Sequence, residues 1–412
     1  MKVATQNMTV PKQRFTEFDG DWVKRKLGDV TKIERGRFSP RPRNNPIYYG
    51  GRIPFVQTSD VVHSNGRIDS FSQTLNEKGL KVSKEFKKGT ILITIAANIG
   101  YAGVLEKNMA CPDSLIGISC NENTYNRFLN YLFEIEQPKM DYLAVAAAQK
   151  NINIDFLTPY KFFFPTLSEQ KKIASFLSAV DERIQKLERK KSLLEEYKKG
   201  VMQKIFSQEL RFKDDNGNNY PEWEMKKITS LAKTSIGLVT SMTKHYVKLG
   251  TPLIRNSDIV QNKIKKENLI YLDKDFDESN KGRRLYYKDI VTVHTGEIGV
   301  SAVIDNELNG CQGFATLNTR IYNQEIISSE YLCWYYNSTY NIKYAISMAT
   351  GDGRSNYNLK DFNKAFIPVP HKYEQQKIAS FLSGIDKKIE LVETQIQQSK
   401  SFKKGLLQQM FV

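Results

Sequence analysis

The chain has 412 residues, with 61 Lys or Arg against 45 Asp or Glu, so its formal net charge is +16. At about 150 residues per domain, this length predicts two or three domains. Hydrophobic residues make up 40% of the chain, which is enough to bury a core and excludes a wholly disordered protein. No apolar run approaches the ~18 residues that a membrane span requires. The first fifteen residues contain no apolar signal core, and we expect a cytoplasmic protein.

The excess of positive charge favours a polyanionic partner, most often nucleic acid; the alternative is that it serves solubility alone. The four cysteines form no Cys-x-x-Cys pair, so neither a structural zinc site nor a disulfide framework is expected. Cys111 and Cys311 stand at equivalent places in the repeat described next, and we expect both to be buried apolar residues.

An internal repeat is the most specific feature of the sequence. The segment EQKKIASFLSAVDERI starts at Glu169, and EQQKIASFLSGIDKKI starts at Glu374, 205 residues later. Nearly half of the positions in Glu169–Phe206 are identical in the second copy, including a Lys-Lys-Gly near its end. Weaker similarity extends upstream, where IPFVQTSDVV from Ile53 matches TPLIRNSDIV from Thr251. The chain therefore contains one unit twice, in residues 1–206 and 207–412.

Each repeated segment predicts a long amphipathic helix. Thr166 and Glu169 form a capping-box pattern that predicts the start of the first helix. Apolar residues then recur at heptad spacing in both copies, namely Ile173, Leu177, Val180, Ile184 and Leu187, and Ile378, Leu382, Ile385, Ile389 and Val392. Each helix could be an ordinary amphipathic helix on its own domain, but two matching seams favour pairing with each other. Gly200 and Gly405 interrupt the pattern and indicate a bend, a close helix crossing or a frayed end.

The direction of pairing follows from connectivity. The second globular segment leaves the end of the first helix and enters the start of the second, and only antiparallel packing places those ends together. A helix of this length spans roughly 57 Å, which a parallel arrangement would force one domain to bridge. We therefore expect globular domains at residues 1–165 and 208–370, related by a pseudo-twofold axis, with antiparallel coiled-coil helices at 166–207 and 371–412.

The globular segments combine short strands with turns and a few helices. Glycine turns separate β-rich runs in residues 82–103 and 287–303, and helices are expected near 125–135 and 328–340. The predicted fold class is α+β, with two α/β domains and the helix pair.

Polar residues in the irregular segments are candidates for contact with DNA, because Arg pairs with guanine and Asn or Gln with adenine. Several recur at equivalent places in both halves, although any one of them could be a solvated loop residue. The candidates are Arg35, Arg37, Arg41, Arg43, Gln57, Ser59, Asn98, Gln149, Lys150 and Asn151 in the first half, and Arg255, Asn256, Ser257, His294, Glu297, Arg354, Ser355, Asn356 and Tyr357 in the second.

Sequence signatures of catalysis are missing. There is no GxxxxGK[ST] phosphate loop and no glycine-rich dinucleotide fingerprint. The four histidines have no metal-ligand spacing. Asn45-Pro46-Ile47-Tyr48 is similar to the Asn-Pro-Pro-Tyr loop of amino-methyltransferases but lacks its second Pro, and we interpret it as a turn. The sequence predicts a non-catalytic protein with no metal or cofactor of its own.

A domain that ends in an aromatic-Pro run, a helix that starts EQ-x-KIA-x-FLS-x-x-D, and the same order again resemble the specificity subunits of type I restriction–modification systems (HsdS). The resemblance covers essentially the whole chain, and the duplicated helix start is its specific part. It implies two target recognition domains, each reading one half of an asymmetric, bipartite site in double-stranded DNA. It also implies that the paired helices set the gap between the half-sites and dock the methyltransferase subunits.

The same resemblance implies partners and cofactors. Two copies of the modification methyltransferase subunit (HsdM) would bind S-adenosylmethionine and methylate adenines. Two copies of the restriction subunit (HsdR) could join the complex and use ATP and Mg²⁺. No membrane partner is implied. For twofold-related readers on one face of DNA, half-sites about one helical turn apart, roughly 34 Å, are expected.

Two other classes of protein stay open at this point. A stand-alone DNA methyltransferase or nuclease with unrecognised motifs would bind S-adenosylmethionine or a divalent metal as the isolated chain. A coiled-coil adaptor without DNA binding would show no salt-dependent affinity for DNA.

Overall fold

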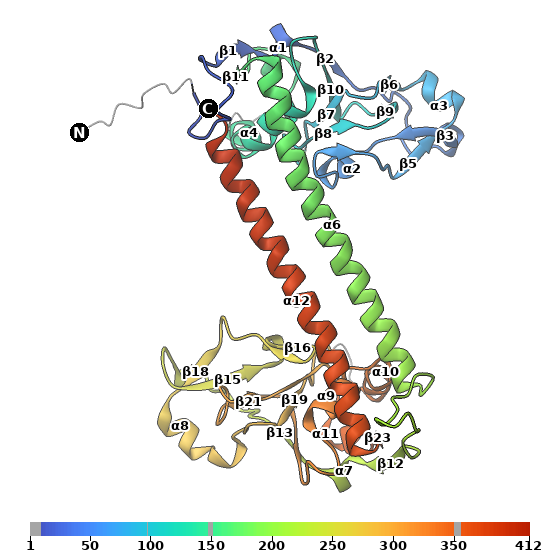
Figure 1. Ribbon diagram of the computed structural model, residues 1–412, viewed down its shortest axis with the longest axis vertical. Helices are drawn as coiled ribbons and strands as arrows, with labels where there is room; N and C mark the ends of the chain where they lie inside the picture. The colour runs from blue at the N-terminus through green and yellow to red at the C-terminus, as the bar shows by residue number, and fades with distance from the viewer. Residues whose placement is uncertain (1–9, 97, 147–150, 350–355) are drawn as a thin grey trace, which may run out of the picture. The chain divides into compact units, whose positions relative to one another are not determined.

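The computed structural model describes residues 10–96, 98–146, 151–349 and 356–412. It divides into two compact units. Unit 1 comprises Met1–Glu188 and Thr394–Val412, and unit 2 comprises Arg189–Glu393. Each boundary falls inside a long helix, α6 (Leu167–Phe206) or α12 (Lys372–Gln409). Each unit therefore contains a globular domain, the start of the helix that follows it, and the end of the other helix (Figure 1).

Unit 1 is built on two sheets and a two-stranded ribbon. The ribbon pairs β1 (Val23–Lys26) with β11 (Lys161–Phe164), so that the two ends of the domain meet. The five-stranded sheet has the order β2-β10-β7-β8-β4, with bounds Thr31–Arg35, Leu115–Cys120, Ile91–Thr94, Ala102–Leu105 and Arg67–Ile68. The four-stranded sheet has the order β5-β3-β9-β6, with bounds Gln73–Leu75, Tyr49–Phe55, Met109–Cys111 and Lys84–Phe86.

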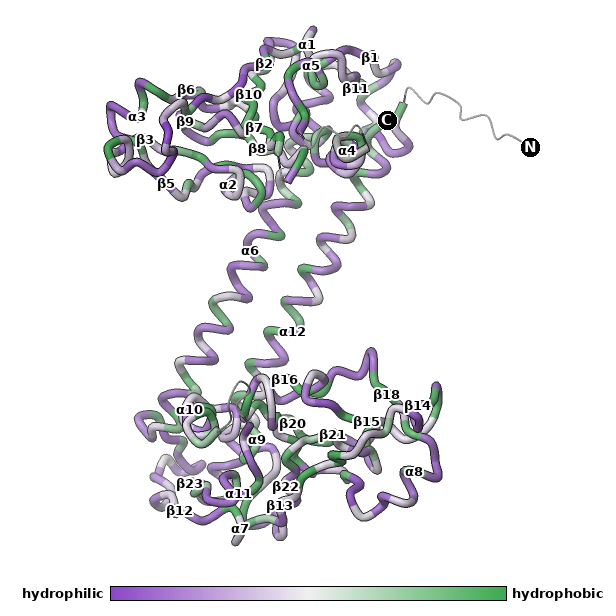
Figure 2. The backbone as a smooth tube through the Cα atoms, turned by 180° about the vertical axis from the view of Figure 1, so that it is seen from behind, coloured by the Kyte–Doolittle hydropathy of each residue, from purple (hydrophilic) through white to green (hydrophobic). Residues whose placement is uncertain are grey.

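The helices of unit 1 cover the sheets. Its short helices are α1 (Leu27–Val30), α2 (Thr58–Val62), α3 (Glu77–Lys81) and α5 (Ile154–Leu157), and its longer one is α4 (Asn126–Ala146). All four residues of β7 are buried, and Figure 2 colours this part of unit 1 as hydrophobic. The predicted helix near residues 125–135 is thus confirmed and extends further.

Unit 2 repeats this plan. The β12 (Glu224–Lys227) and β23 (Phe366–Val369) ribbon corresponds to β1 and β11. One sheet has the order β13-β22-β19-β20, with bounds Ala232–Ile236, Leu317–Ile321, Ile290–Thr292 and Ser301–Val303; the other has the order β14-β18-β15-β21, with bounds Tyr246–Val247, Ile270–Leu272, Thr251–Arg255 and Gln312–Phe314. A hairpin joins β16 (Ile259–Val260) to β17 (Lys263–Ile264). Its helices are α7 (Ile228–Leu231), α8 (Lys274–Ser279), α9 (Ser329–Tyr336), α10 (Thr339–Met348) and α11 (Leu359–Phe362).

A buried glutamate fixes the start of α6 to unit 1. The Glu169 carboxylate accepts from Arg14 Nε at 2.7 Å and from Trp22 Nε1 at 3.3 Å. Gln170 beside it accepts from the backbone N–H of Tyr125 at 2.9 Å and donates to the Pro165 carbonyl oxygen at 3.0 Å. Buried polar groups persist only when such partners satisfy them. We call this arrangement the helix anchor.

The same helix anchor fixes the start of α12 to unit 2. Glu374 accepts from Arg211 Nη2 at 2.9 Å and from Trp223 Nε1 at 3.0 Å. Gln375 accepts from the Ser328 backbone N–H at 2.9 Å and donates to the Pro370 carbonyl oxygen. The Glu-Gln pair that marks both copies of the repeat is therefore a buried structural device.

The predicted capping box is only half formed. Glu169 N–H donates to Thr166 Oγ1 at 3.4 Å, but the Glu169 carboxylate serves the helix anchor. This carboxylate accepts from Arg14 and Trp22 instead of from the backbone N–H of Thr166. A buried carboxylate gains more from a cation and an indole N–H than from one amide.

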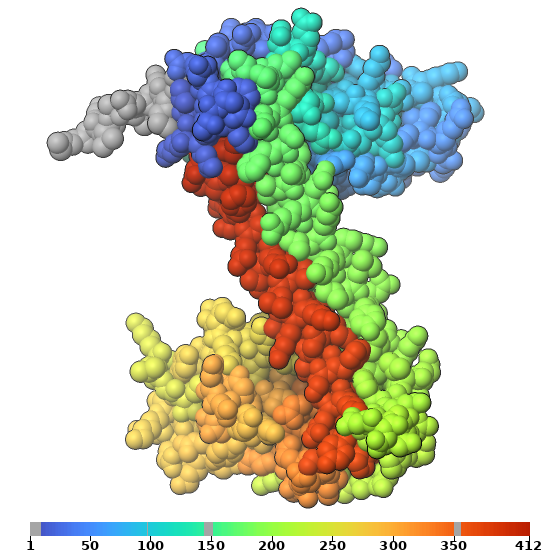
Figure 3. All heavy atoms as spheres, viewed as in Figure 1, coloured from blue at the N-terminus to red at the C-terminus, as the bar shows by residue number. Residues whose placement is uncertain are grey.

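Within each unit the end of the other long helix completes the core. In unit 1, Phe411 packs on Phe128 with ring centroids 5.3 Å apart and on Trp22 at 6.1 Å. In unit 2, Phe206 packs on Tyr331 at 6.1 Å. Figure 3 shows the C-terminal end of α12 against the N-terminal segment of unit 1, where Gln13 N–H donates to the Gln409 carbonyl oxygen at 2.8 Å.

Inside each unit α6 and α12 run antiparallel, as their ion pairs show. In unit 1, Asp181 pairs with Lys403 at 2.9 Å and Glu188 with Lys400 at 2.7 Å. In unit 2, Lys198 pairs with Asp386 at 2.8 Å and Lys191 with Glu393 at 3.0 Å. Numbers that rise along α6 fall along α12. The aspartate and lysine concerned are repeated in both copies, so each helix supplies the aspartate in one unit and the lysine in the other.

The heptad residues face the interior of each unit. Ile173 and Leu177 share a core cluster with Leu406 and Met410, and the residues from Ile378 to Ile389 share one with Val201 and Ile205. Val180 and Leu187 are half-buried, and the remaining predicted seam residues, Ile184, Ile385 and Val392 among them, are buried. The first turns of each helix therefore contact both the domain and the other helix.

Gly200 and Gly405 lie inside continuous helix. A Cβ added at either would meet no atom within 4 Å. The expectation of a close helix crossing at these glycines is therefore wrong, because a close crossing requires a backbone neighbour at the glycine.

Glu374→Ala tests the helix anchor. It leaves the guanidinium of Arg211 and the indole N–H of Trp223 without their buried acceptor, so we expect the unfolding free energy of unit 2 to fall by about 3–5 kcal/mol. Urea unfolding of the full chain measures it. The matched control is Glu196→Ala on α6, which is exposed and forms no ion pair with any described residue; equal transitions for the two variants would contradict the role of the anchor.

Candidate nucleic-acid interface

The end of β2 and the loop after it carry four exposed arginines, and two of them meet at Asp113. Arg35 Nε donates to the Asp113 carbonyl oxygen at 2.7 Å, and Arg43 Nη2 lies 2.8 Å from Asp113 Oδ1. Arg37 and Arg41 donate to backbone carbonyl oxygens instead. This loop is a cationic surface whose guanidinium groups are held in place.

Gln57 and Ser59, at the start of α2, lie next to this loop. Thr58 Oγ1, between them, donates to Ser114 Oγ at 3.3 Å, and Ser114 follows Asp113 directly. Gln57 is half-buried and Ser59 is exposed. The strand β3 and the loop before β10 thus bring two predicted segments together.

Asn98 and Asn151 extend the same set of loops. The Ser114 carbonyl oxygen accepts from Ile95 N–H at 3.4 Å. Ala96, one residue on, forms an isolated β-bridge with Asn151. Asn98 and Asn151 are exposed. The structure therefore links the segments that carry predicted residues from four separate stretches of unit 1 through Ser114 and Ala96.

The equivalent place in unit 2 holds a hydrogen-bonded cluster. Asn256 Oδ1 accepts from His294 N–H at 3.1 Å, and Asn256 Nδ2 donates to the Ala315 carbonyl oxygen at 3.4 Å. Thr295 Oγ1 donates to Asn356 Oδ1 at 2.7 Å. Three predicted residues, Asn256, His294 and Asn356, therefore meet, and we call them the unit 2 cluster.

The contact of His294 defines its tautomer. His294 Nδ1 lies 2.8 Å from the Tyr357 carbonyl oxygen, which can only accept, so Nδ1 carries a proton. The neutral ring then presents Nε2 as an acceptor. An acceptor suits the amino groups of adenine or cytosine in the major groove.

Two predicted residues of unit 2 are engaged in the structure. Arg255 Nη2 lies 2.7 Å from Asp258 Oδ1, and the hydrogen bonds that Arg255 donates to Asp258 raise the pKa of Arg255. Tyr357 is 1% exposed and packs in the core. Ser257 and Glu297 are exposed. The side chains of Arg255 and Tyr357 therefore support the fold rather than the surface.

The remaining predicted residues, Gln149, Lys150, Arg354 and Ser355, lie outside the described residues. Sequence reasoning missed Ser114, which joins the loops of unit 1, and Lys233 and Arg283 near the unit 2 cluster. The Arg-Arg pair at 283–284 in a polar loop was the only available signal.

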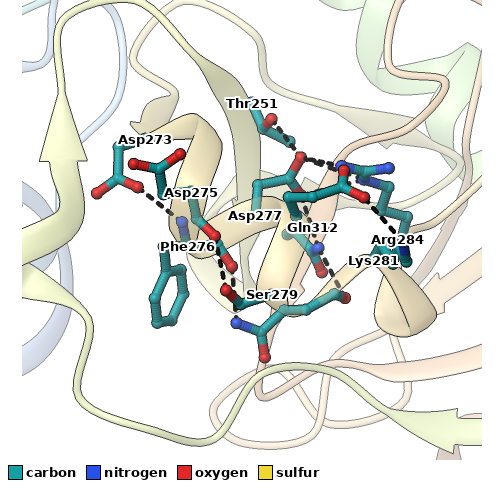
Figure 4. Close-up of polar contacts among 11 residues, drawn as sticks. Thr251, Asp273, Asp275, Phe276, Asp277, Ser279, Lys281, Arg284 and Gln312 are labelled. Atoms are coloured by element: carbon teal, nitrogen blue, oxygen red, sulfur yellow. Dashed lines mark hydrogen bonds and ion pairs between the residues drawn. The ribbon is translucent and has the colours of Figure 1, made fainter.

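A buried network of hydrogen bonds around Asp277 supports the part of unit 2 that leads to the unit 2 cluster (Figure 4). Asp277 of α8, 4% exposed, accepts from Arg284 Nη2 at 2.7 Å, Thr251 Oγ1 at 2.9 Å and Gln312 Nε2 at 2.8 Å. Burial acts to raise the pKa of Asp277, but these hydrogen bonds outweigh it and hold the pKa below its ordinary value. The network ties α8 to β15 and β21, and Asn256 follows β15 directly.

The described residues contain no group of three or more His, Cys, Asp or Glu that could hold a metal ion. Cys111 and Cys311 are fully buried, as predicted, and burial raises the pKa of Cys311 to about 12, so this thiol stays protonated. No helix in the described parts of the chain is long and apolar enough to cross a membrane.

Comparison with known protein families identifies the family of this chain. The type I restriction modification DNA specificity domain matches residues 19–196 and again 220–400. The chain belongs to this family. As a specificity subunit it is a non-catalytic, DNA-recognising component of a type I restriction–modification system, and an enzyme or a bare adaptor is not favoured.

Relatives of this specificity subunit match along its length. The type I restriction enzyme MjaIX specificity subunit of Methanocaldococcus jannaschii is 21% identical over 94% of this chain and 92% of its own. The MjaVIII specificity subunit of the same organism is 22% identical over 96% and 94%. Among solved structures, the type I S subunit from M. genitalium superposes with a TM-score of 0.62 at 17% identity, covering 98% of this chain and 99% of its own. The shared fold is α+β, as predicted.

Asp277→Asn tests the supporting network through its pH dependence. Because the folded pKa of Asp277 is lowered, its contribution is present above the unfolded value of about 3.9 and is lost as the pH falls through the folded pKa. We expect the variant to be about 1–3 kcal/mol less stable at pH 7, with the difference shrinking below about pH 4. Urea unfolding from pH 3 to 8 measures it.

The control is Asp275→Asn on the same helix, whose exposed carboxylate makes no hydrogen bond or ion pair with any described residue. A deficit in Asp277→Asn that stayed constant down to pH 3 would show that the charge of Asp277 is not what stabilises unit 2.

Proposed function

We propose that unit 1 and unit 2 each read one half of an asymmetric, bipartite site in duplex DNA. The observation that carries this is the recurrence of a polar cluster at the same place of the same fold with different residues in it. Thr58 and Ile95 of unit 1 stand where unit 2 has Asn256 and His294, whereas Asn151 and Asn356 are equivalent and identical. Amide and imidazole groups read base edges, so different residues imply different half-sites.

The residues that we assign to this interface are the predicted residues of these loops that are exposed or half-buried, apart from Arg255, whose guanidinium is paired with the buried Asp258. In unit 1 these are Arg35, Arg37, Arg41, Arg43, Gln57, Ser59, Asn98 and Asn151, and in unit 2 they are Asn256, Ser257, His294, Glu297 and Asn356. Guanidinium groups would pair with guanine or phosphate, whereas the amides and His294 would discriminate adenine and cytosine.

We infer that α6 and α12 act as the spacer between target recognition domains at 1–165 and 208–370, and that they dock the methyltransferase. The support is that both helices are fixed at their starts by the helix anchor, and that reciprocal ion pairs join them inside each unit. A spacer must keep its length without slippage, and the helix anchors together with the part-buried ion pairs between the helices provide this.

The expected partner subunits supply the catalytic chemistry for which the sequence shows no motif. We propose that two methyltransferase subunits, using S-adenosylmethionine, methylate adenines in the site that this chain selects, and that two restriction subunits using ATP and Mg²⁺ can join them. Target DNA and the net charge of +16 are consistent with action in the cytoplasm, where cellular and invading DNA are accessible.

A comparison of N6-methyladenine in the host genome with and without this gene tests the function. We expect one bipartite motif with a fixed gap and two different halves to lose methylation. Asn256→Ala should then relax only the half read by unit 2, because losing a bidentate contact costs about 1–3 kcal/mol of base discrimination. Relaxation of both halves, or of neither, would contradict the assignment.

The matched control for Asn256→Ala is Asn306→Ala, an exposed asparagine of the same unit outside the cluster, which should leave the motif unchanged. If deletion of the gene changes no methylation, recovery of a methyltransferase on the tagged full chain separates a silent partner from a wrong function.

Insertion of four helical residues into both long helices tests the spacer. Placed after Glu188 and after Glu393, at the two boundaries between the units, the insertions leave each unit intact and add about 6 Å. We expect the gap to grow by about one to two base pairs while both half-sites persist. Insertion into α6 alone is the control, since it shifts the ion pairs out of register. A changed half-site in the double insertion would contradict the spacer role.

A further inference from the structure

A cationic groove of about 350 Å³ lies in unit 2 along β13 and β22. Its lining includes four cationic side chains and one carboxylate, namely Lys233, Arg283, Arg284, Arg320 and Asp289. Such an excess of positive charge in a groove attracts polyanions.

Two of the four cations have acidic partners. Arg284 Nη2 lies 2.7 Å from a carboxylate oxygen of Asp277, and Arg320 Nε donates to Asp289 Oδ1 at 2.9 Å. These two side chains are therefore largely neutralised where they stand.

The other two cations are uncompensated. Arg283 Nη1 donates to the carbonyl oxygens of Ile236 at 3.2 Å and Gly237 at 2.9 Å, which orient the guanidinium but do not neutralise it. Nε and Nη2 of Arg283 remain available to a ligand. Lys233 is exposed and has no hydrogen bond or ion pair among the described residues. Arg283 and Lys233 thus present two free positive charges to the groove.

A short run of hydrogen bonds links one of these two cations to the unit 2 cluster. Gly237, which holds Arg283, precedes Leu238, whose carbonyl oxygen accepts from Ala315 N–H at 2.8 Å. The Ala315 carbonyl oxygen accepts from Asn256 Nδ2. Arg283 is therefore joined to the residues that we assign to base reading, and Lys233 lies further along β13 in the same groove.

Unit 1 supplies charge at the same place from another part of its chain. Gly36 N–H bonds to the Leu115 carbonyl oxygen as Gly237 N–H bonds to that of Thr316, so the two glycines are equivalent. The residue before Gly36 is Arg35, whereas the residue before Gly237 is the uncharged Ile236. In unit 2 Arg283 reaches this position from the loop after α8. Each unit thus carries an arginine near the equivalent glycine, Arg35 next to Gly36 in the chain and Arg283 hydrogen-bonded to the Gly237 carbonyl oxygen.

We propose that Arg283 and Lys233 bind phosphate groups of the DNA backbone beside the half-site read by unit 2. This rests on the proposed function and adds to it a division of labour, in which these two side chains give affinity and the unit 2 cluster gives specificity. Phosphate contacts carry no sequence information and release condensed counterions, so their loss has a recognisable signature.

The test measures binding of the full chain, in complex with its methyltransferase subunits, to two labelled duplexes. One duplex carries the motif mapped by methylation, and the other has the unit 2 half-site scrambled. Lys233→Gln and Arg283→Gln should each weaken binding about fivefold at physiological salt, equally for both duplexes, and lower the slope of log K against log salt by about one. Lys227→Gln, an exposed lysine of β12, is the matched control and should change neither.

Each outcome separates the phosphate contacts of Arg283 and Lys233 from the half-site reading on which they rest. Variants with the wild-type salt slope, or with a loss confined to the mapped motif, would overturn the phosphate assignment while the proposed function stands. Wild-type protein that binds both duplexes alike, with reduced slopes in the variants, would support the phosphate contacts and overturn half-site reading. Because the Lys233 side chain makes no hydrogen bond or ion pair with any described residue, Lys233→Gln keeps the test decisive even if Arg283→Gln unfolds, which thermal melting would reveal.

Discussion

The buried carboxylate at the start of each long helix is the interaction on which the rest of the structure depends. Glu169 and Glu374 each hold an arginine and a tryptophan indole out of water, and the glutamine that follows each of them binds the backbone of the preceding domain. Removing either partner would leave an unsatisfied buried charge. The direction in which each helix leaves its domain is thereby fixed.

The second constraint is reciprocity between the two helices. Asp181 and Asp386 pair with Lys403 and Lys198, so a single repeated pattern of aspartate and lysine serves both units. Burial acts to lower the pKa of Lys403, but Glu134 and Asp181 outweigh it and raise the pKa, so the ammonium stays charged. Each helix must supply the aspartate of the ion pair in one unit and the lysine in the other. This double requirement restricts substitution along the helices, which explains why identity between the two copies is concentrated there.

The recognition surface obeys a looser rule. Its loops occupy equivalent places in both units, but amides, hydroxyls and guanidinium groups come from different positions in each. Arg35 and Arg283 illustrate this, since each lies near one of the equivalent glycines Gly36 and Gly237 but comes from a different segment of the chain. The fold determines where the recognition surface lies, and the residues of its loops determine which chemical groups that surface presents.

The sequence by itself determined the duplication, the two long helices, the α+β class and the resemblance to specificity subunits, because heptad spacing and a repeated motif are local patterns. It also placed candidates such as Asn256 and His294 in loops. Only the tertiary structure decided that these two meet, that Arg255 and Tyr357 support the fold, that the Glu169 carboxylate serves the helix anchor, and that Arg283 bonds to Gly237. These outcomes depend on contacts between residues far apart in the chain, and neither burial nor the direction of a side chain can be read from local spacing.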